Sequence, residues 1–379
     1  MARLMHLVTA LTEPGRWLIR YWLRLLCVCV LGVVPFVGCT ESAGVCPGTV
    51  CPCTEEGILA AIAAGGGAYT FDCEGPTTVA TQAEIVIDND VILDGEGNLT
   101  VDADHPQRVF SVPEGVNAEL HRLTATHGRG QEGGGVANEG TLTIHDCVIS
   151  HNSTPGLRWP PGEEVGGGIR NAGQMTIINS TISENYADHT VGGGIYNGGE
   201  MTIINSTVSD NSAHDAVGEL SGGGIWNGGT LTLTHSTVWG NTADSGDAIA
   251  VDPSSNTEIA NTLIDGDCGV YDIFSQPGTP DIASNGYNIE SPENTCGFNQ
   301  TGDQVSVTEE ELNLGELADN GGPTMTHKPG DGDFGEDSVA IDAIPIDDCE
   351  VTEDQRGQPR PETGGTTCDV RAFEVQPEP

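Results

Sequence analysis

The sequence predicts an all-β fold: a single-stranded right-handed parallel β-helix, with a helical cap at its N-terminal end and an irregular cap at its C-terminal end. Three observations lead to this prediction. A 20-residue core recurs along the chain, apolar residues alternate with polar ones inside each copy, and glycine and asparagine stand at fixed places between the alternating segments. If each copy forms one coil, equivalent residues of successive copies lie above one another.

Four copies of the core align without gaps. They are GGGVANEGTLTIHDCVISHN (133–152), GGGIRNAGQMTIINSTISEN (166–185), GGGIYNGGEMTIINSTVSDN (192–211) and GGGIWNGGTLTLTHSTVWGN (222–241). A degraded fifth copy, EIANTLIDGD, follows at 258–267. The copies start 33, 26 and 30 residues apart, so a constant core is joined by spacers of variable length. This is the pattern expected of stacked coils with loops between them.

The alternation has a period of two residues, which indicates strands, and no segment is long enough for a helix. Each copy should hold about three short strands separated by tight bends. Three apolar columns should point inward: Val136, Ile169, Ile195 and Ile225; Leu142, Met175, Met201 and Leu231; and Ile149, Ile182, Val208 and Val238. Asparagine tolerates a left-handed backbone, and stacked asparagine side chains can hydrogen-bond to one another. Two asparagine columns are therefore expected at bends. They are Asn138, Asn171, Asn197 and Asn227, and Asn152, Asn185, Asn211 and Asn241.

The solenoid is expected to span 54–300, with a C-terminal tail or cap at 301–379. Fainter repeats at 83–104 and 108–128 extend the pattern toward the N-terminus. Before them, TEEGILAAIAAGG (54–66) predicts a helix that Thr54 caps and whose apolar residues cover the first coil. A cap is needed because the open end of a β-helix is an unpaired edge.

The first 38 residues are interpreted as a targeting signal. Four arginines precede the apolar run LLCVCVLGVVPFV (25–37), which is too short for a comfortable membrane span. The run ends in Phe36-Val37-Gly38-Cys39 and here resembles a bacterial lipoprotein signal. That resemblance implies cleavage before Cys39 and a lipid on Cys39, followed by a cysteine-rich tether at 39–53. An ordinary signal peptide or an N-terminal anchor helix are the alternatives.

Charge and cysteine content fit an exported protein. A mature chain that starts at Cys39 keeps nine of the 13 basic and 55 of the 56 acidic residues, a formal charge of −46, which opposes binding to nucleic acid. Cys39 is set aside as the lipid attachment site. Cys147 stands where the other repeats have serine, so it should be a buried free thiol. Eight cysteines remain for four disulfides. Cys268 with Cys296 and Cys349 with Cys368 are the natural local pairs, and the other four should pair among themselves: Cys46, Cys51, Cys53 and Cys73.

The tail carries a more specific resemblance. Four motifs follow in order: ADNGGPTMTH (318–327), SVAIDA (338–343), DQRGQPRP (354–361) and CDVRAFE (368–374). Together with the repeats, they resemble secreted bacterial β-helix proteins of the pectate-lyase-like solenoid type that end in a choice-of-anchor Q domain. Members usually have glycine where Arg371 stands, and a Gly-Ser-Pro run where Glu336-Asp337-Ser338-Val339 stands. The resemblance implies a surface-exposed protein with no established activity.

The sequence contains few of the acidic and basic residue arrangements that a polysaccharide lyase or hydrolase needs. A polysaccharide lyase needs a basic residue to abstract a proton, yet the mature chain has one lysine, Lys328, and no arginine between 171 and 355. A hydrolase needs two carboxylates ~5–9 Å apart. Glu184 and Asp210, neighbours on adjacent coils, are the best candidate pair. An ordinary exposed position is the alternative.

Two binding sites are considered. Arg170, Tyr196 and Trp226 occupy one outward column, and Trp239 also points outward; exposed aromatic rings in a row can stack on sugars. The alternative is a stabilising ladder of neighbouring side chains. Calcium is the one cofactor that the sequence suggests: three carboxylates in GDGDFGED could hold it, although the EF-hand spacing is absent. They are Asp331, Asp333 and Asp337.

These observations favour a non-enzymatic lipoprotein of the outer membrane or cell surface. Its membrane contact would be the N-terminal lipid, and its partner a polysaccharide or another surface protein. The alternative is a carbohydrate-active enzyme, a hydrolase or lyase of extracellular glycans, that uses Glu184, Asp210 or neighbouring acids. Fold alone does not decide between them.

Overall fold

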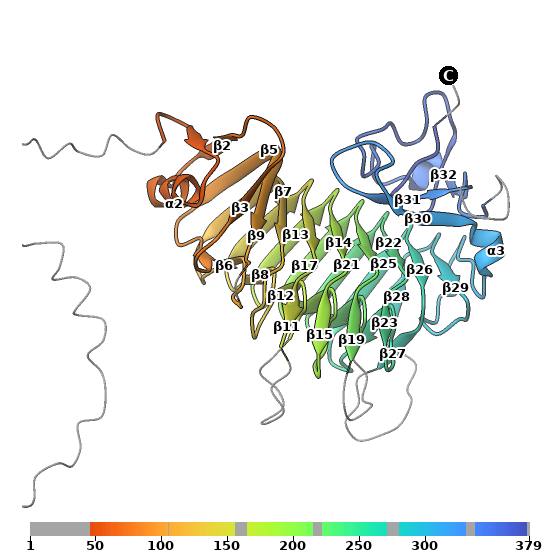
Figure 1. The fold of residues 1–379 in the computed structure, drawn as a ribbon. Helices are drawn as coiled ribbons and strands as arrows, with labels where there is room; N and C mark the ends of the chain where they lie inside the picture. The colour runs from red at the N-terminus through yellow and green to blue at the C-terminus, as the bar shows by residue number, and fades with distance from the viewer. Residues whose placement is uncertain are drawn as a thin grey trace, which may run out of the picture. The chain divides into compact units, whose positions relative to one another are not determined.

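The computed structural model describes residues 46–104, 106–155, 165–214, 222–270, 280–330 and 338–376. They lie within one compact unit, Gly44–Pro379, whose body is a solenoid of parallel strands (Figure 1). The lipidation candidate Cys39 and the calcium candidates Asp331, Asp333 and Asp337 lie outside the described residues.

Three parallel sheets form the walls of the solenoid. Sheet B takes one strand from each of eight coils: β4 (Ile85–Val86), β6 (Phe110–Val112), β8 (Val136–Asn138), β12 (Ile169–Asn171), β16 (Ile195–Asn197), β20 (Ile225–Asn227), β24 (Ile249–Val251) and β27 (Cys268–Val270). Sheet C has four strands: β11 (Ser153–Thr154), β15 (Tyr186–Asp188), β19 (Ser212–His214) and β23 (Thr242–Ala243).

Sheet A has 17 strands and forms two adjoining faces. Its N-terminal strands are β1 (Val50–Pro52), β2 (Ala68–Asp72), β3 (Thr77–Ala80), β5 (Val91–Asp102) and β7 (Asn117–Thr126). Later coils give it two strands each: β9 (Thr141–His145), β10 (Val148–Ser150), β13 (Gln174–Ile178), β14 (Thr181–Ser183), β17 (Glu200–Ile204), β18 (Thr207–Ser209), β21 (Thr230–Thr234), β22 (Thr237–Trp239), β25 (Asn256–Ala260), β26 (Leu263–Asp265), β28 (Ile282–Ser284) and β29 (Ile289–Ser291). Each full repeat therefore contributes four short strands, one more than the alternation predicted.

The fourth strand lies in the spacer after each 20-residue core: β15, for example, begins at Tyr186, just after the core at 166–185. The core itself holds three strands, as predicted, and Asn179, with a φ of 49°, forms the corner between β13 and β14. The same left-handed corner recurs at Asn205 and Asn261.

The inward columns are confirmed. Ile169, Ile195 and Ile225 pair directly across β12, β16 and β20, and all three are fully buried. No side chain in the three predicted apolar columns is more than 3% exposed. Burying one such side chain contributes about 1.5–3 kcal/mol, so the stack of equivalent residues is the main apolar support of the fold.

Both asparagine columns form buried hydrogen-bonded ladders. In the first, each Nδ2 donates to the next Oδ1 at 2.8, 2.9 and 2.8 Å from Asn138 through Asn227. In the second, the distances from Asn152 through Asn241 are 3.0, 2.9 and 3.0 Å. The chain turns at these columns, as expected.

The left-handed residue at the second column is, however, the one before each asparagine. His151, Glu184 and Asp210 have φ values of 57°, 55° and 56°, and Gly240 takes the same place at 63°. No stacked asparagine of either column has a positive φ, so the prediction of a left-handed backbone at these residues was wrong for both columns. The preceding residue turns outward at the bend, which leaves the asparagine side chain pointing inward to its ladder.

The helical cap is confirmed at the N-terminal end. Helix α2 (Glu55–Ala64) begins after Thr54, whose Oγ1 accepts a hydrogen bond from Gly57 N at 3.2 Å. Ile58 and Ile62 are buried in the same core as the apolar columns. The predicted tether overlaps this end, because β1 pairs with β2 and Cys46 is already joined to Cys51. Residues from Cys46 onward thus belong to the folded unit.

The C-terminal part includes two short hairpins, β30 (Leu314–Ala318) with β31 (Thr326–Pro329) and β32 (Ile344–Pro345) with β33 (Thr367–Cys368). It also contains helix α3 (Glu309–Leu312) and the 3₁₀ helix η1 (Ile346–Asp348). In Figure 1 this part lies beside β14, β22 and β26 as well as beyond the last coil. The irregular cap therefore covers a side of the solenoid in addition to its end.

We predict that the asparagine ladders are essential for stability. In Asn197→Ala, Asn171 loses its acceptor, and Asn227 Oδ1 and the Gly199 amide lose hydrogen bonds inside the wall. The free energy of unfolding, measured by urea denaturation, should fall by about 3 kcal/mol. Glu200→Ala, at an exposed position of β17, is the matched control and should change it by less than about 0.5 kcal/mol. Equal losses in the two variants would contradict the assigned role.

Candidate functional site

The predicted carboxylate pair does not form an enclosed site. Glu184 and Asp210 lie at equivalent exposed corners of adjacent coils. Glu184 Oε2 lies 2.8 Å from His151 Nε2, and Asp210 Oδ2 accepts a hydrogen bond from Ser209 Oγ at 2.8 Å. Each carboxylate thus has its own partner, and neither lines the three surface hollows described below.

The predicted aromatic column exists in register but is not open. Arg170, Tyr196 and Trp226 are paired residues of β12, β16 and β20. The Tyr196 and Trp226 rings stack with centroids 4.5 Å apart and planes 5° from parallel. Trp226 is only 8% exposed, however, and its ring lies over the backbone of Gly228. The expectation of an exposed aromatic row is wrong here, and the stabilising ladder describes these rings better.

Trp239 lies on a different wall from the other three. It pairs with Ser209 in sheet A, whereas the aromatic column belongs to sheet B. Trp239 packs against a second apolar core that includes residues of the tail, and its ring is 5.9 Å from that of His327. The four proposed ligand-binding residues therefore do not form one surface.

The tail motifs explain what covers sheet A. The buried carboxamide of Gln355 joins two coils: its Oε1 accepts from Thr207 Oγ1 at 2.7 Å, and its Nε2 donates to Thr181 Oγ1 at 3.0 Å. One coil further on, Thr237 Oγ1 accepts from the backbone of Ala372 at 3.2 Å. The threonine column of the repeat is thus the docking surface of the tail. The sequence alone did not indicate this role, because threonines on the outer face of a strand are common and carry no sign of what covers them.

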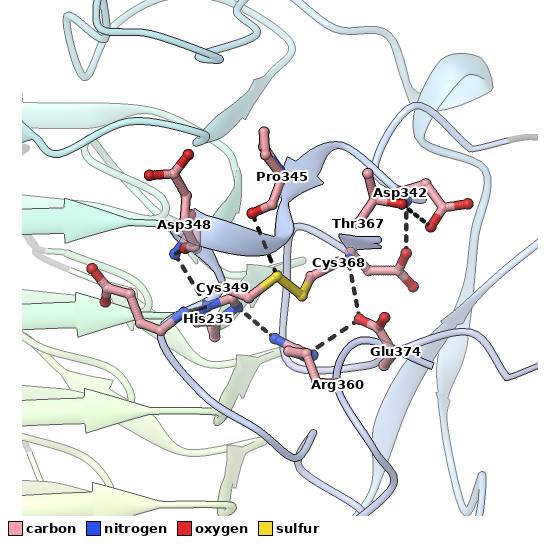
Figure 2. Close-up of a disulfide and its surroundings, with 12 residues drawn as sticks. His235, Asp342, Pro345, Asp348, Cys349, Arg360, Thr367, Cys368 and Glu374 are labelled. Atoms are coloured by element: carbon pink, nitrogen blue, oxygen red, sulfur yellow. Dashed lines mark hydrogen bonds and ion pairs between the residues drawn. A yellow bond between two sulfur atoms is a disulfide. The ribbon is translucent and has the colours of Figure 1, made fainter. Parts of the chain in front are cut away.

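A second row of tail contacts runs along the left-handed corners of sheet A. The side chains of Asn205 and Asn261 donate to the carbonyls of Glu353 and Asp348 at 2.7 and 3.1 Å. In the coil between them the corner residue is His235, which is fully buried. Figure 2 shows His235 beside the disulfide Cys349–Cys368 of the tail.

The surroundings of His235 require an uncharged ring. Arg360 Nη1 lies 2.6 Å from His235 Nδ1, and because a guanidinium only donates, Nδ1 must be unprotonated (Figure 2). A neutral ring then carries its proton on Nε2, which lies 3.1 Å from Asn261 Nδ2 and 3.3 Å from the backbone nitrogen of Glu350. Burial, and then the charge of Arg360, hold the pKa of His235 well below its usual value.

Inside the tail, three arginines and three carboxylates form an ionic core. Its members are Arg356, Arg360, Arg371, Asp354, Asp369 and Glu374. Burial, reinforced by the nearby charge of Asp369, raises the pKa of Glu374 to about 7. Arg371 has a φ of 144°, a region that favours glycine, which is the residue that the resemblance to the choice-of-anchor Q domain leads one to expect there.

A serine, a histidine and an aspartate also meet where the tail crosses β18. Ser209 Oγ lies 2.8 Å from both Asp210 Oδ2 and His327 Nε2, and His327 Nδ1 donates to the Gly315 carbonyl at 2.9 Å. This is not a catalytic triad, because the aspartate does not orient the imidazole and Ser209 is fully buried beneath the tail. Burial lowers the pKa of His327 and favours its neutral form.

The cysteine predictions are confirmed. Disulfides join Cys268 to Cys296 and Cys349 to Cys368, and the four N-terminal cysteines pair as Cys46–Cys51 and Cys53–Cys73. Cys147 is a buried free thiol, and burial raises its pKa to about 12. Within the described ranges, no group of three or more histidine, cysteine or carboxylate side chains is arranged to hold a metal ion. No helix in the same ranges is both long and apolar enough to cross a membrane.

Comparison with known proteins supports the fold. Residues 85–264 match the model of a family described as "Right handed beta helix region". No curated protein and no solved structure matches the chain. The matched residues extend from β4 to β26 and include all four full repeats. With the parallel sheets, this defines the class: a right-handed parallel β-helix protein.

We predict that acid weakens the docking of the tail through His235. The unfolded histidine takes up a proton near pH 6.5, whereas the folded one does so only at a much lower pH. The contribution of His235 to the free energy of unfolding is therefore complete above pH 6.5 and is lost as the pH falls below that value. The loss is about 1.4 kcal/mol per pH unit. The pKa of His327 is also lowered, so its protonation likewise destabilises the fold as the pH falls. The pKa of Glu374 is raised to about 7, so this group has the opposite effect on stability.

The matched variant is His235→Asn, because asparagine occupies this corner in the coils on either side, at Asn205 and Asn261. Chemical denaturation between pH 5 and 7 should show a steeper fall of the unfolding free energy with acid in the natural chain than in the variant. The two slopes should differ by about one proton. If the slopes coincide, His235 does not couple protonation to the folded state.

Proposed function

We propose that this protein is a lipid-anchored protein of the cell surface or outer membrane whose β-helix is a non-enzymatic scaffold for binding. The observation that carries the proposal is Cys39 at the end of an apolar run that follows four arginines. A lipid at Cys39 would hold the folded unit, which starts a few residues later, close to the membrane. The four disulfides support export to an oxidising compartment.

The tail motifs support the same proposal. The resemblance to a choice-of-anchor Q domain rests on four ordered motifs, and three of them supply the residues that hold the tail on the solenoid, such as His327, Gln355 and Ala372. The motifs therefore do structural work at the interface with the coils. These tail contacts lie on sheet A, so sheets B and C are the walls that we propose for binding a partner.

Catalysis on glycans is the less favoured function. Glu184 and Asp210 are exposed, each has a separate partner, and none of the three hollows contains them. A glycoside hydrolase needs two carboxyl groups that flank one bound sugar, whereas these two lie at open corners and contact different partners. The proposed partner is a polysaccharide or a surface protein, since a mature chain that starts at Cys39, with a charge of −46, repels nucleic acid.

The anchor is tested by Cys39→Ser in the full chain, expressed in a bacterium that carries the lipoprotein pathway. The natural protein should take up radiolabelled palmitate and sediment with membranes, and the variant should do neither. Cys29→Ser, inside the apolar run, is the control and should behave like the natural chain. A Cys39→Ser protein that still carries label would rule out the proposed anchor.

The absence of catalysis is tested with the purified protein on a panel of immobilised extracellular polysaccharides. We expect retention on at least one polymer without release of reducing ends or unsaturated products. Glu184→Gln and Asp210→Asn should bind as the natural chain does. Product release that disappears in either variant would establish the enzyme instead.

A further inference from the structure

Three surface hollows are formed by described residues, and one differs from the others in charge. The first two have volumes of about 510 and 400 Å³ and are lined by acids, Asp72 with Glu74 and Asp90 with Glu119. The third, of about 340 Å³, contains two arginines, Arg108 and Arg129. Its one carboxylate is Glu84, so the lining carries a net positive charge. In a mature chain of charge −46, this is a local exception.

Arg129 is available to a ligand. It is exposed, and no ion pair joins it to a carboxylate within the described ranges. Other arginines are engaged: Arg122 pairs with Asp94, and those of the tail form the ionic core. Arg108 is partly engaged, since its Nη1 lies 2.9 Å from Glu84 Oε1 and its Nε donates to the Gly133 carbonyl at 3.0 Å. These two contacts fix the Arg108 side chain at the rim of the hollow.

Arg129, which lines the hollow, is also the first residue of a column that leads into sheet C. Arg129 pairs with Ser153, and Ser153 pairs with Tyr186. Tyr186 therefore lies two coils from Arg129, at a distance of ~10 Å given the usual strand spacing. Tyr186 is 38% exposed, unlike Trp226, and its hydroxyl donates to Asp188 Oδ1 at 3.2 Å. This hydrogen bond holds one edge of a ring that remains accessible.

An arginine fork and an exposed aromatic ring bind different parts of one kind of ligand. The guanidinium matches the two oxygens of a carboxylate or sulfate group, and the aromatic face stacks on the apolar face of a sugar ring. The column places the two groups within the length of a short oligosaccharide. Gln107 and Gln131 add amides at the hollow that can bond to hydroxyl groups.

We propose that Arg129, Arg108 and Tyr186 form a binding site for an acidic saccharide, with its anionic group in the hollow and a neighbouring sugar ring on Tyr186. The inference rests on the proposed binding function and names its surface and ligand class. The aromatic column that the sequence predicted lies on sheet B, so this site is a separate one. The acidic surroundings restrict the anion to the hollow, where the arginines lie.

The test is calorimetric titration of the full mature chain with three tetrasaccharides of the same backbone: one carrying uronic acids, one sulfated and one neutral. We expect binding of at least one acidic probe, weakened by 0.5 M sodium chloride because the contact is partly exposed. Comparing the uronate with the sulfate identifies the anionic group. Arg129→Gln should weaken binding at least about tenfold, and Tyr186→Ala should weaken it several-fold.

Arg122→Gln is the matched control, because it removes an arginine that is already paired with Asp94 on another wall; it should bind as the natural chain does. Circular dichroism should show that all variants keep the β-helix. The inference is overturned if no acidic probe binds, if the neutral probe binds equally well, or if Arg129→Gln binds like the control. Retention of neutral polymers alone on the polysaccharide panel would preserve the proposed function while refuting this site.

Discussion

The structure depends on vertical register: each residue of a repeat lies directly over its equivalent in the next coil. The constraint is enforced most strictly by the asparagine ladders, where a carboxamide donates to the one above and accepts from the one below. These amides are buried, so a coil that slipped by one residue would leave both donors and acceptors unsatisfied and would also turn its apolar residues outward. Polar and apolar columns therefore specify the same register.

The same register produces the outer surface. Because Thr181, Thr207 and Thr237 occupy equivalent places, their hydroxyls form a regular row that the tail contacts through Gln355 and Ala372. The corner residues Asn205 and Asn261 form a parallel row with its own tail contacts. Because the repeat places the same residue type at the same position of each coil, it forms an extended docking surface for the tail.

The sequence correctly predicted the positions of residues that recur in every repeat. Ile169, Ile195 and Ile225 could be placed on one wall because three copies agree, and the disulfides followed from which cysteines lie near each other along the chain. Contacts between a repeat and the tail could not be predicted in this way, because the tail does not repeat and no recurring pattern marks its partners. Gln355 contacts Thr181 across 174 residues of sequence, and nothing in either local sequence indicates the partner.

The candidate sites show the same division. Alternation correctly predicted that Trp226 points away from the core, but the direction of a side chain does not reveal what covers it, and the ring proved buried. The hollow at Arg129 was missed for the opposite reason, because it depends on the exposure of one arginine and on loops outside the repeat. Periodicity establishes position along a wall, whereas accessibility depends on tertiary packing.

The contacts of the tail also bear on how such a chain can evolve. Solenoids grow or shrink readily when a unit is duplicated or deleted, because each unit touches only its neighbours. Here Gln355 and Ala372 span three consecutive coils, so a unit gained or lost between Thr181 and Thr237 would separate attachment points that must match the tail. We therefore expect changes in length to be tolerated better before Thr181 than in the coils that the tail joins.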